Sequence, residues 1–129
     1  EFDDNGPIAA ARNASYWHSE SASDDMSLFK GRWIQVRNPK TDDVAYAQWV
    51  DVGPNEERDY GYVFGGSNTK PKNTFGLRAG LDISPATATA LKLDQDAGGG
   101  TVTWRFVNAK DVPAGAWTRL PAIDNRLHW

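Results

Sequence analysis

The sequence predicts a small all-β domain with one or two short helices. Short or alternating runs of apolar residues predict β-strands at residues 32–37, 44–50 and 101–107. Turn-forming residues separate these runs, and one stretch between them carries the signals of a helix N-terminus. The chain has 129 residues, which is enough to bury one sizeable core but not two.

The first part of the chain is expected to contribute little regular structure. Residues 1–12 are small and polar, and they predict a flexible lead-in to a single domain spanning residues 13–129. Within that domain, residues 13–17 predict a first strand, and the Ser- and Asp-rich residues 19–27 predict a loop.

Residues 32–50 predict a β-hairpin. Its turn, residues 38–43, is rich in Asn, Pro and Asp, which favour bends. Alternation along the second strand assigns Val44, Tyr46, Gln48 and Val50 to one face, and Ala45, Ala47 and Trp49 to the other.

A long irregular segment is predicted at residues 55–78. A loop of this length in a small domain is usually functional or disordered. The alternating aromatic residues Tyr60, Tyr62 and Phe64 argue against disorder. We therefore expect an ordered segment that borders a functional surface.

The predicted helix spans residues 86–93. Ser84 has the character of an N-cap and Pro85 that of a first helical residue. Three glycines, residues 98–100, predict the following turn, and residues 111–129 predict an irregular covering segment. The apolar stripe of the helix is predicted to consist of Ala86, Ala90, Leu91 and Leu93.

Composition excludes several classes of function. The 14 basic and 17 acidic residues give a net charge of −3, and the basic residues are scattered, which argues against a nucleic-acid partner. The chain has no Cys and only two His, so we expect no metal or other cofactor. No apolar run approaches the roughly 20 residues that a membrane span needs. Six Trp residues indicate either an aromatic core or a groove lined by flat rings, as in proteins that stack on sugars.

Two motifs, in this order, carry a resemblance to a known group. The first is Asp51-Val52-Gly53-Pro54 at the end of a predicted strand; the second is Leu81-Asp82-Ile83-Ser84 at the start of the predicted helix. The chain thereby resembles the double-psi β-barrel group of rare lipoprotein A, the expansins and the barwin-like endoglucanases. The resemblance covers roughly residues 32–107 and implies a six-stranded double-psi barrel. Val52 stands where the lipoprotein motif has Arg, and the segment after Pro54 is longer than usual for the group.

Asp82 is the principal catalytic candidate. It lies between Leu81 and Ile83, where we expect partial desolvation, and desolvation favours the protonated form of a carboxyl group. A protonated acid can donate to the oxygen of a glycosidic bond. The resemblance also implies this role, because the aspartate of the matching motif is the catalytic acid in the lytic transglycosylases and endoglucanases. The alternative is a structural Asp82 that binds backbone N–H groups.

Two further residues are weaker catalytic candidates. Asp51 is either a second carboxylate at the barrel mouth or an acceptor in the turn at Gly53-Pro54, and the turn role is favoured. His18 directly follows Tyr16-Trp17, where the related endoglucanases have a base aspartate. It is either a base or a sign that the base is absent, as in expansins and transglycosylases.

Aromatic residues supply the candidate substrate-binding surface: Tyr16, Trp17, Trp49, Tyr60, Tyr62 and Phe64. By contrast, Trp33, Trp104 and Phe106 are assigned mainly to the core. Lys70, Lys72 and Arg78 could meet an acidic polymer, although scattered surface charge is the simpler account.

The resemblance implies a secreted or periplasmic monomer that acts on cell-wall polysaccharide, either peptidoglycan or a plant or fungal glycan. The expected activity is cleavage of glycosidic bonds with Asp82 as a single acid, as a lytic transglycosylase or an endoglucanase-like hydrolase. Two alternatives stay open. One is a non-catalytic carbohydrate-binding module of expansin type, and the other is a barwin-like or inhibitor-like barrel that binds a protein.

Overall fold

The computed structural model of the chain describes residues 2–3, 6–7, 31–50, 59–64, 70–75 and 78–119. Within these residues the fold is small and β-rich, with antiparallel strands and short helices. Contacts divide the chain into two compact units. The first unit comprises Glu1–Phe29, Asp51–Asp82 and Asn125–Trp129, and the second comprises Lys30–Val50 and Ile83–Asp124.

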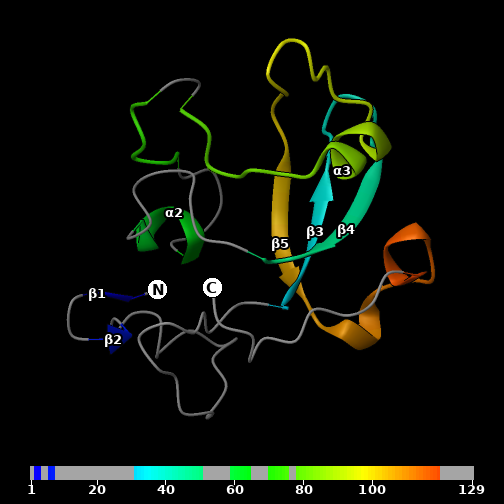
Figure 1. The fold of residues 1–129 in the computed structure, drawn as a ribbon, viewed down its shortest axis with the longest axis horizontal. Coiled ribbons are helices and arrows are strands. Elements are labelled where there is room, and N and C mark those ends of the chain that lie inside the picture. The colour runs from blue at the N-terminus through cyan, green and yellow to red at the C-terminus, as the bar shows by residue number, and fades with distance from the viewer. Residues whose placement is uncertain are drawn as a thin grey trace. The chain divides into compact units, whose positions relative to one another are not determined.

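The second unit is built on a three-stranded antiparallel sheet (Figure 1). Strand β3 (Trp33–Arg37) lies between β4 (Val44–Gln48) and β5 (Thr103–Val107). The three predicted strands of this region are therefore confirmed, each with slightly narrower bounds than the sequence suggested.

The register of the sheet separates its two faces. Ile34 is paired with Ala47 and Phe106, and Val36 is paired with Ala45 and Trp104, so these residues share one face. That face provides most of the core, since Ile34, Val36, Ala45 and Phe106 are all buried. Trp33 is paired with Gln48 and Val107 on the opposite face and is half-buried. Trp33 therefore does not share the core face with Phe106, because it stands one residue out of phase with Ile34.

Helix α3 (Pro85–Ala90) contacts β4. It begins as predicted, with Pro85 at the start and with the Ser84 side chain accepting a hydrogen bond from the Thr87 N–H at 3.2 Å. The predicted apolar stripe was right for Leu91, which is buried, but wrong for Ala86 and Ala90, which are exposed. The helix instead buries Ala88, and the adjoining C-cap Leu91, three residues later, is fully buried.

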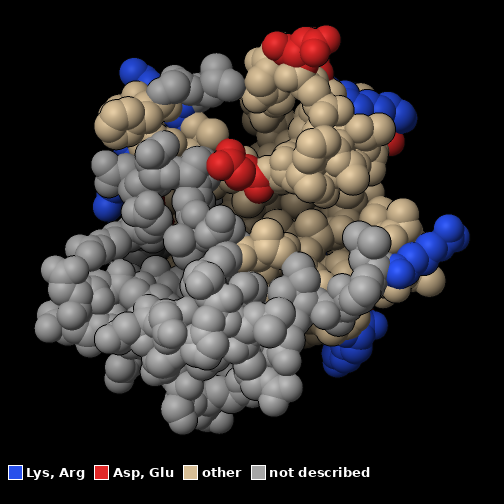
Figure 2. Space-filling view, in the orientation of Figure 1, with Lys and Arg blue, Asp and Glu red and all other residues tan. Residues whose placement is uncertain are grey.

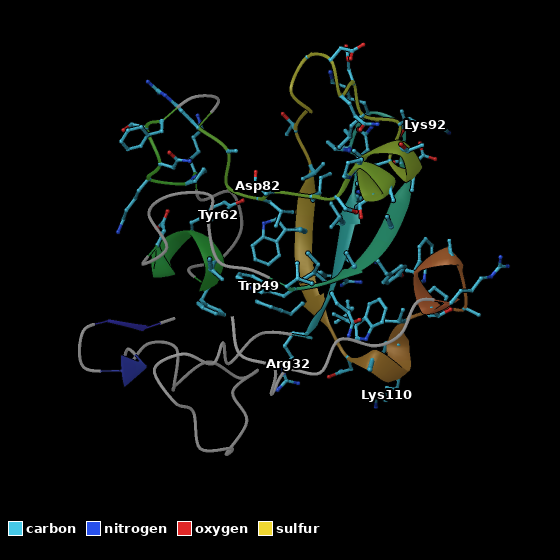
Figure 3. All side chains as sticks on the ribbon, viewed as in Figure 1. Arg32, Trp49, Tyr62, Asp82, Lys92 and Lys110 are labelled. Carbon is cyan, nitrogen blue, oxygen red and sulfur yellow. The ribbon has the colours of Figure 1, made fainter. Side chains whose placement is uncertain are left out.

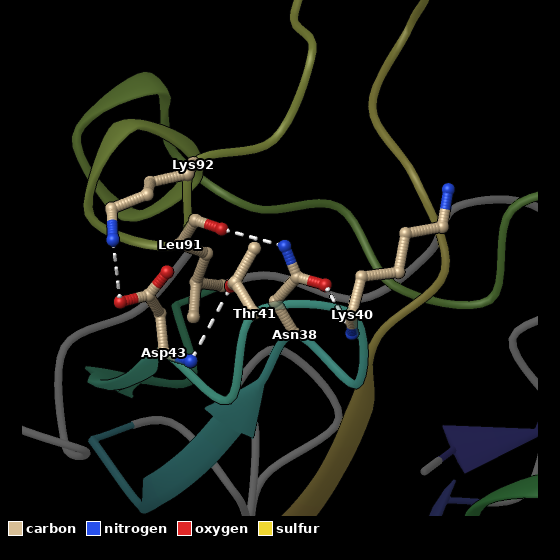
Figure 4. Close-up of polar contacts among 6 residues, drawn as sticks. All are labelled: Asn38, Lys40, Thr41, Asp43, Leu91 and Lys92. Carbon is tan, nitrogen blue, oxygen red and sulfur yellow. Dashed lines mark hydrogen bonds and ion pairs between the residues drawn. The ribbon is translucent and has the colours of Figure 1, made fainter.

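The turn of the hairpin docks on the end of α3 (Figure 4). Asn38 is only 3% exposed; its side-chain amide donates to the Leu91 carbonyl at 2.8 Å, and its amide oxygen accepts from the Lys40 N–H. The Lys92 ammonium lies 3.0 Å from the Asp43 carboxylate. Two polar links therefore hold residues that are about 50 positions apart in the sequence, and they attach the helix to the sheet.

After β5 the second unit contains two 3-10 helices, η1 (Ala109–Asp111) and η2 (Ala116–Arg119), and η2 contacts β4. The glycine-rich turn before β5 is confirmed, with positive φ angles of 78° at Gly98 and 106° at Gly99.

The first unit contains helix α2 (Tyr60–Phe64). The prediction of an irregular segment was wrong here, because Asp59 caps a helical turn: its carboxylate accepts from the Tyr62 N–H at 3.2 Å. The first unit also contains the two-residue strands β1 (Phe2–Asp3) and β2 (Gly6–Pro7), which pair antiparallel within the expected lead-in. The predicted strand at residues 13–17 lies outside the described residues.

Candidate functional site

The predicted site residues fall into three groups. His18, Tyr16, Trp17 and Asp51 lie outside the described residues. Trp49 belongs to the second unit. The remaining candidates, Tyr60, Tyr62, Phe64 and Asp82, belong to the first unit.

Trp49 packs against the aromatic residues of β5. Its ring is stacked on Phe106 with 5.8 Å between centroids, and it meets Trp104 edge-on at 6.1 Å. The backbone is held as well, because the Trp49 N–H donates to the Arg32 carbonyl at 2.8 Å. One face of the predicted sugar platform is therefore occupied by Phe106, and the cluster stabilises the second unit.

Asp59 organises the described part of the first unit. It is 7% exposed, and its two carboxylate oxygens accept from the backbone N–H groups of Tyr62 and of Lys72, the latter at 2.7 Å. The Lys72 ammonium lies 3.9 Å from the same carboxylate. A buried carboxylate with these partners joins α2 to the segment at residues 70–75. The sequence analysis missed Asp59, although an Asp directly before an aromatic run is an N-cap signal.

Tyr62 lies against the backbone of Gly80. A Cβ at position 80 would lie 2.5 Å from the phenol carbon and 2.5 Å from the phenol oxygen of Tyr62, so only glycine leaves room for this ring. Gly80 is two residues before Asp82, and Figure 3 shows Tyr62 and Asp82 in the same region of this unit. The structure therefore brings a predicted sugar platform to the motif that carries the catalytic candidate.

Tyr62 and Phe64 of α2 do not form one continuous platform. Successive helical positions differ by about 100°, so Tyr62 and Phe64 point roughly 200° apart. Alternate positions such as Tyr62 and Phe64 therefore lie on different sides of the helix.

Asp82 is exposed to solvent. Figure 2 shows an acidic side chain at the surface where Figure 3, in the same orientation, labels Asp82. The burial that was expected between Leu81 and Ile83 is not found. The carboxylate is therefore accessible to a ligand.

Asn73 is a buried polar residue that the sequence analysis did not select. Its side chain is 3% exposed; it donates to the Ala79 carbonyl at 2.9 Å and accepts from the Phe75 N–H at 2.8 Å. The Arg78 N–H donates to the Phe75 carbonyl at 2.8 Å. Phe75 is thereby held at a turn with 66% of its surface exposed, in the neighbourhood of Lys70, Lys72 and Arg78. The ring is thus accessible to a ligand, as single exposed apolar side chains commonly are on protein surfaces.

The described residues contain no group of three or more His, Asp or Glu side chains that could hold a metal ion. Among the helices of the described segments, none has the length and apolar character needed to cross a membrane.

Nothing matches this chain in comparisons with protein-family models, curated proteins and solved structures. The resemblance to the double-psi barrel group therefore depends on the two sequence motifs.

Proposed function

We propose that this chain is an exported, double-psi barrel protein that acts on cell-wall polysaccharide through Asp82 and Tyr62. The observation that carries the proposal is the contact of the Tyr62 ring with Gly80, two residues from the exposed Asp82. A flat ring and a carboxylate at one place suit a pyranose, because the ring can stack on the sugar's C–H groups while the carboxylate accepts from its hydroxyl groups.

In the catalytic form of this proposal, Asp82 acts as the single acid. Its protonated carboxyl group donates to the glycosidic oxygen, and the bond from that oxygen to the anomeric carbon breaks. A hydroxyl group of the same sugar attacks the anomeric carbon and returns its proton to Asp82, which closes the cycle without a water-activating base. This is the lytic transglycosylase reaction, and its product carries an anhydro end.

The second candidate is a non-catalytic glycan-binding module. The solvent exposure of Asp82 favours it, because an exposed carboxylate accepts hydrogen bonds from sugar hydroxyls without needing to hold a proton. Tyr62 and Phe75 would then supply ring contacts.

The test is mass spectrometry of peptidoglycan and cellulose incubated with the wild-type protein and Asp82→Asn. The matched control is Asp96→Asn, which removes a carboxylate from an exposed turn in the second unit. Anhydro ends that disappear in Asp82→Asn alone establish the transglycosylase. Intact polymer, with binding that weakens in Asp82→Asn and Tyr62→Ala, establishes the module. Activity and binding that are identical in wild type and Asp82→Asn would overturn both.

A further inference from the structure

The face of the sheet opposite the core carries a continuous polar and aromatic row. The register pairs Gln35 of β3 with Tyr46 of β4 on one side and with Arg105 of β5 on the other. The Arg105 Nε donates to the Gln35 amide oxygen at 2.9 Å, and the Gln35 amide nitrogen donates to the Tyr46 hydroxyl at 2.8 Å. Trp117 of η2 continues the row, with its ring 5.3 Å from that of Tyr46.

The direction of these hydrogen bonds determines which donor groups at the two ends of the row are available to a ligand. Arginine can only donate, so the Gln35 oxygen must face Arg105 and its NH₂ group must face Tyr46. The Tyr46 hydroxyl oxygen is then used as an acceptor, and its hydrogen is left to donate elsewhere. At the opposite end, the hydrogen bond of Arg105 within the described segments uses Nε, so both Nη groups keep their N–H donors with respect to these segments.

The charge of Arg105 is not neutralised by the part of the chain that the structure describes. Arg105 is exposed, and the ion pairs of the described segments involve Arg37, Lys72 and Lys92 instead. None of the strand residues on this face is Asp or Glu. They are Trp33, Gln35 and Arg37 of β3, with their partners Val44, Tyr46 and Gln48 of β4 and Thr103, Arg105 and Val107 of β5. A donor-rich row with an unpaired cation is complementary to a carboxylate.

The aromatic end of the row is held in place before any ligand binds. The Trp117 indole N–H donates to the Pro113 carbonyl at 2.8 Å, and a Cβ at Gly115 would lie 2.6 Å from the ring. The ring is therefore packed on the glycine backbone, and Trp117 and Tyr46 are both half-buried. A rigid ring loses little conformational entropy on binding, which favours stacking on a sugar.

We propose that this row, Arg105–Gln35–Tyr46–Trp117, binds an acidic polysaccharide. The Arg105 guanidinium binds the carboxylate of one sugar, and the Tyr46 hydroxyl donates a hydrogen bond to the polysaccharide. The Trp117 ring stacks on a neighbouring pyranose. Strands are about 4.8 Å apart, so the backbones of Arg105 and Tyr46 are separated by roughly 10 Å, the length of a disaccharide. Arg37 on the same face is already paired with Asp42, so among the described residues Arg105 is the strand cation of this face that has no ion pair. A single available cation beside neutral donors and rings suits such a chain better than a nucleic acid, which needs several phosphate contacts.

The proposal uses none of the residues assigned to Asp82-dependent function, so the two can fail separately. The probe is an oligogalacturonate, titrated by calorimetry and by NMR of the backbone amides, with a neutral cello-oligosaccharide of equal length for comparison. Wild-type protein is expected to bind the acidic oligomer, with shifts at Gln35, Tyr46, Arg105 and Trp117. Asp82→Asn is expected to bind it equally well.

Three variants test the row. Arg105→Gln is expected to weaken acidic-sugar binding about tenfold or more, since it removes a charge-assisted contact. Lys110→Gln makes the same charge change at an exposed position of η1 and is expected to leave binding unchanged. Gln35→Glu keeps the side-chain size but offers Arg105 an internal carboxylate, so it is expected to abolish binding in a folded protein, as judged by the melting temperature.

Equal binding of neutral and acidic oligomers would overturn the proposal. So would an equal loss in Lys110→Gln and Arg105→Gln, full binding in Gln35→Glu, or an absence of binding by the wild-type protein.

Discussion

Gly80 is a residue of the first unit that leaves little room for a side chain. Any side chain there meets the Tyr62 ring, since a Cβ would lie 2.5 Å from its outer atoms. We predict that Gly80→Ala destabilises the protein by about 1–3 kcal/mol, because the ring must leave its position. Urea unfolding measures this effect.

Gly61 supplies the matched control for that prediction. It lies within α2, and a Cβ there would be 3.9 Å from its nearest neighbour, the Asp59 carboxylate. Gly61→Ala is expected to be neutral or stabilising by up to about 1 kcal/mol, because alanine favours a helix. Equal unfolding midpoints for the two variants would show that the Tyr62–Gly80 contact is unimportant.

Asp43 links the stability of the second unit to pH. Hydrogen bonds with the side chains of Thr41 and Lys92 lower the pKa of Asp43 below its ordinary value. A carboxyl group with a lowered pKa in the folded state stabilises the fold at pH values above its unfolded pKa, about 3.9. That contribution is lost as the pH falls through the lower, folded-state pKa.

We therefore predict that the NMR titration of the Asp43 carboxyl group has a midpoint below the ordinary value in wild type. In Lys92→Ala the midpoint rises toward that value, while the Thr41 hydrogen bond keeps part of the depression. An unchanged titration in Lys92→Ala would show that the ion pair does not form in solution.

At the scale of elements, α3 ends in an arrangement that glycine usually provides. The Leu93 N–H donates to the Ala88 carbonyl and the Lys92 N–H to the Thr89 carbonyl, which is the Schellman pattern. Lys92 occupies its left-handed position with a φ of 53°. A side chain is strained in this conformation, and here that side chain also forms the ion pair with Asp43.

Two substitutions separate these effects. Lys92→Ala removes the ion pair and keeps the strain, whereas Lys92→Gly removes both. We expect Lys92→Gly to be more stable than Lys92→Ala by about 1 kcal/mol in urea unfolding. Equal stabilities would indicate that the left-handed conformation carries no cost in this turn.

At the scale of the whole molecule, two phenylalanines have opposite roles. Phe106 is 8% exposed and contacts both Trp49 and Trp104, whereas Phe75 is 66% exposed. We predict that Phe106→Ala costs about 3–5 kcal/mol of stability, because it opens a cavity beneath the aromatic cluster. Calorimetry or urea unfolding, followed by Trp fluorescence, measures the loss.

Phe75→Ala makes the same chemical change at the surface. Its stability is expected to stay within about 0.5 kcal/mol of wild type, while glycan binding falls if the turn contacts the ligand. A large stability loss in Phe75→Ala would instead assign that ring to packing.

Local patterns were sufficient to predict the three strands and helix α3 of the second unit, but not its two 3-10 helices, η1 and η2. Short-range preferences determined the three strands, the turn of the hairpin and the Ser84–Pro85 start of α3, and each of these is present in the structure. The same short-range pattern also predicted which residues of β4 share a face, because side chains along a strand alternate with a period of two. The resemblance to the double-psi group came from motif order and stays a prediction.

Long-range contacts decided what local patterns could not. The helical turn at Tyr60 depends on Asp59, whose second oxygen binds the Lys72 backbone 13 residues away. The buried side of α3 depends on its contact with β4, so Ala88, rather than Ala86 or Ala90, is buried together with the predicted Leu91. The pairing of Arg105 with Gln35 spans 70 positions, and the exposure of Asp82 depends on the chain that surrounds it rather than on Leu81 and Ile83.

Composition and periodicity thus determined which segments are strands and helices, because those preferences act over a few residues. The partners of each side chain were decided only by tertiary structure, because burial and pairing join residues that the sequence holds far apart.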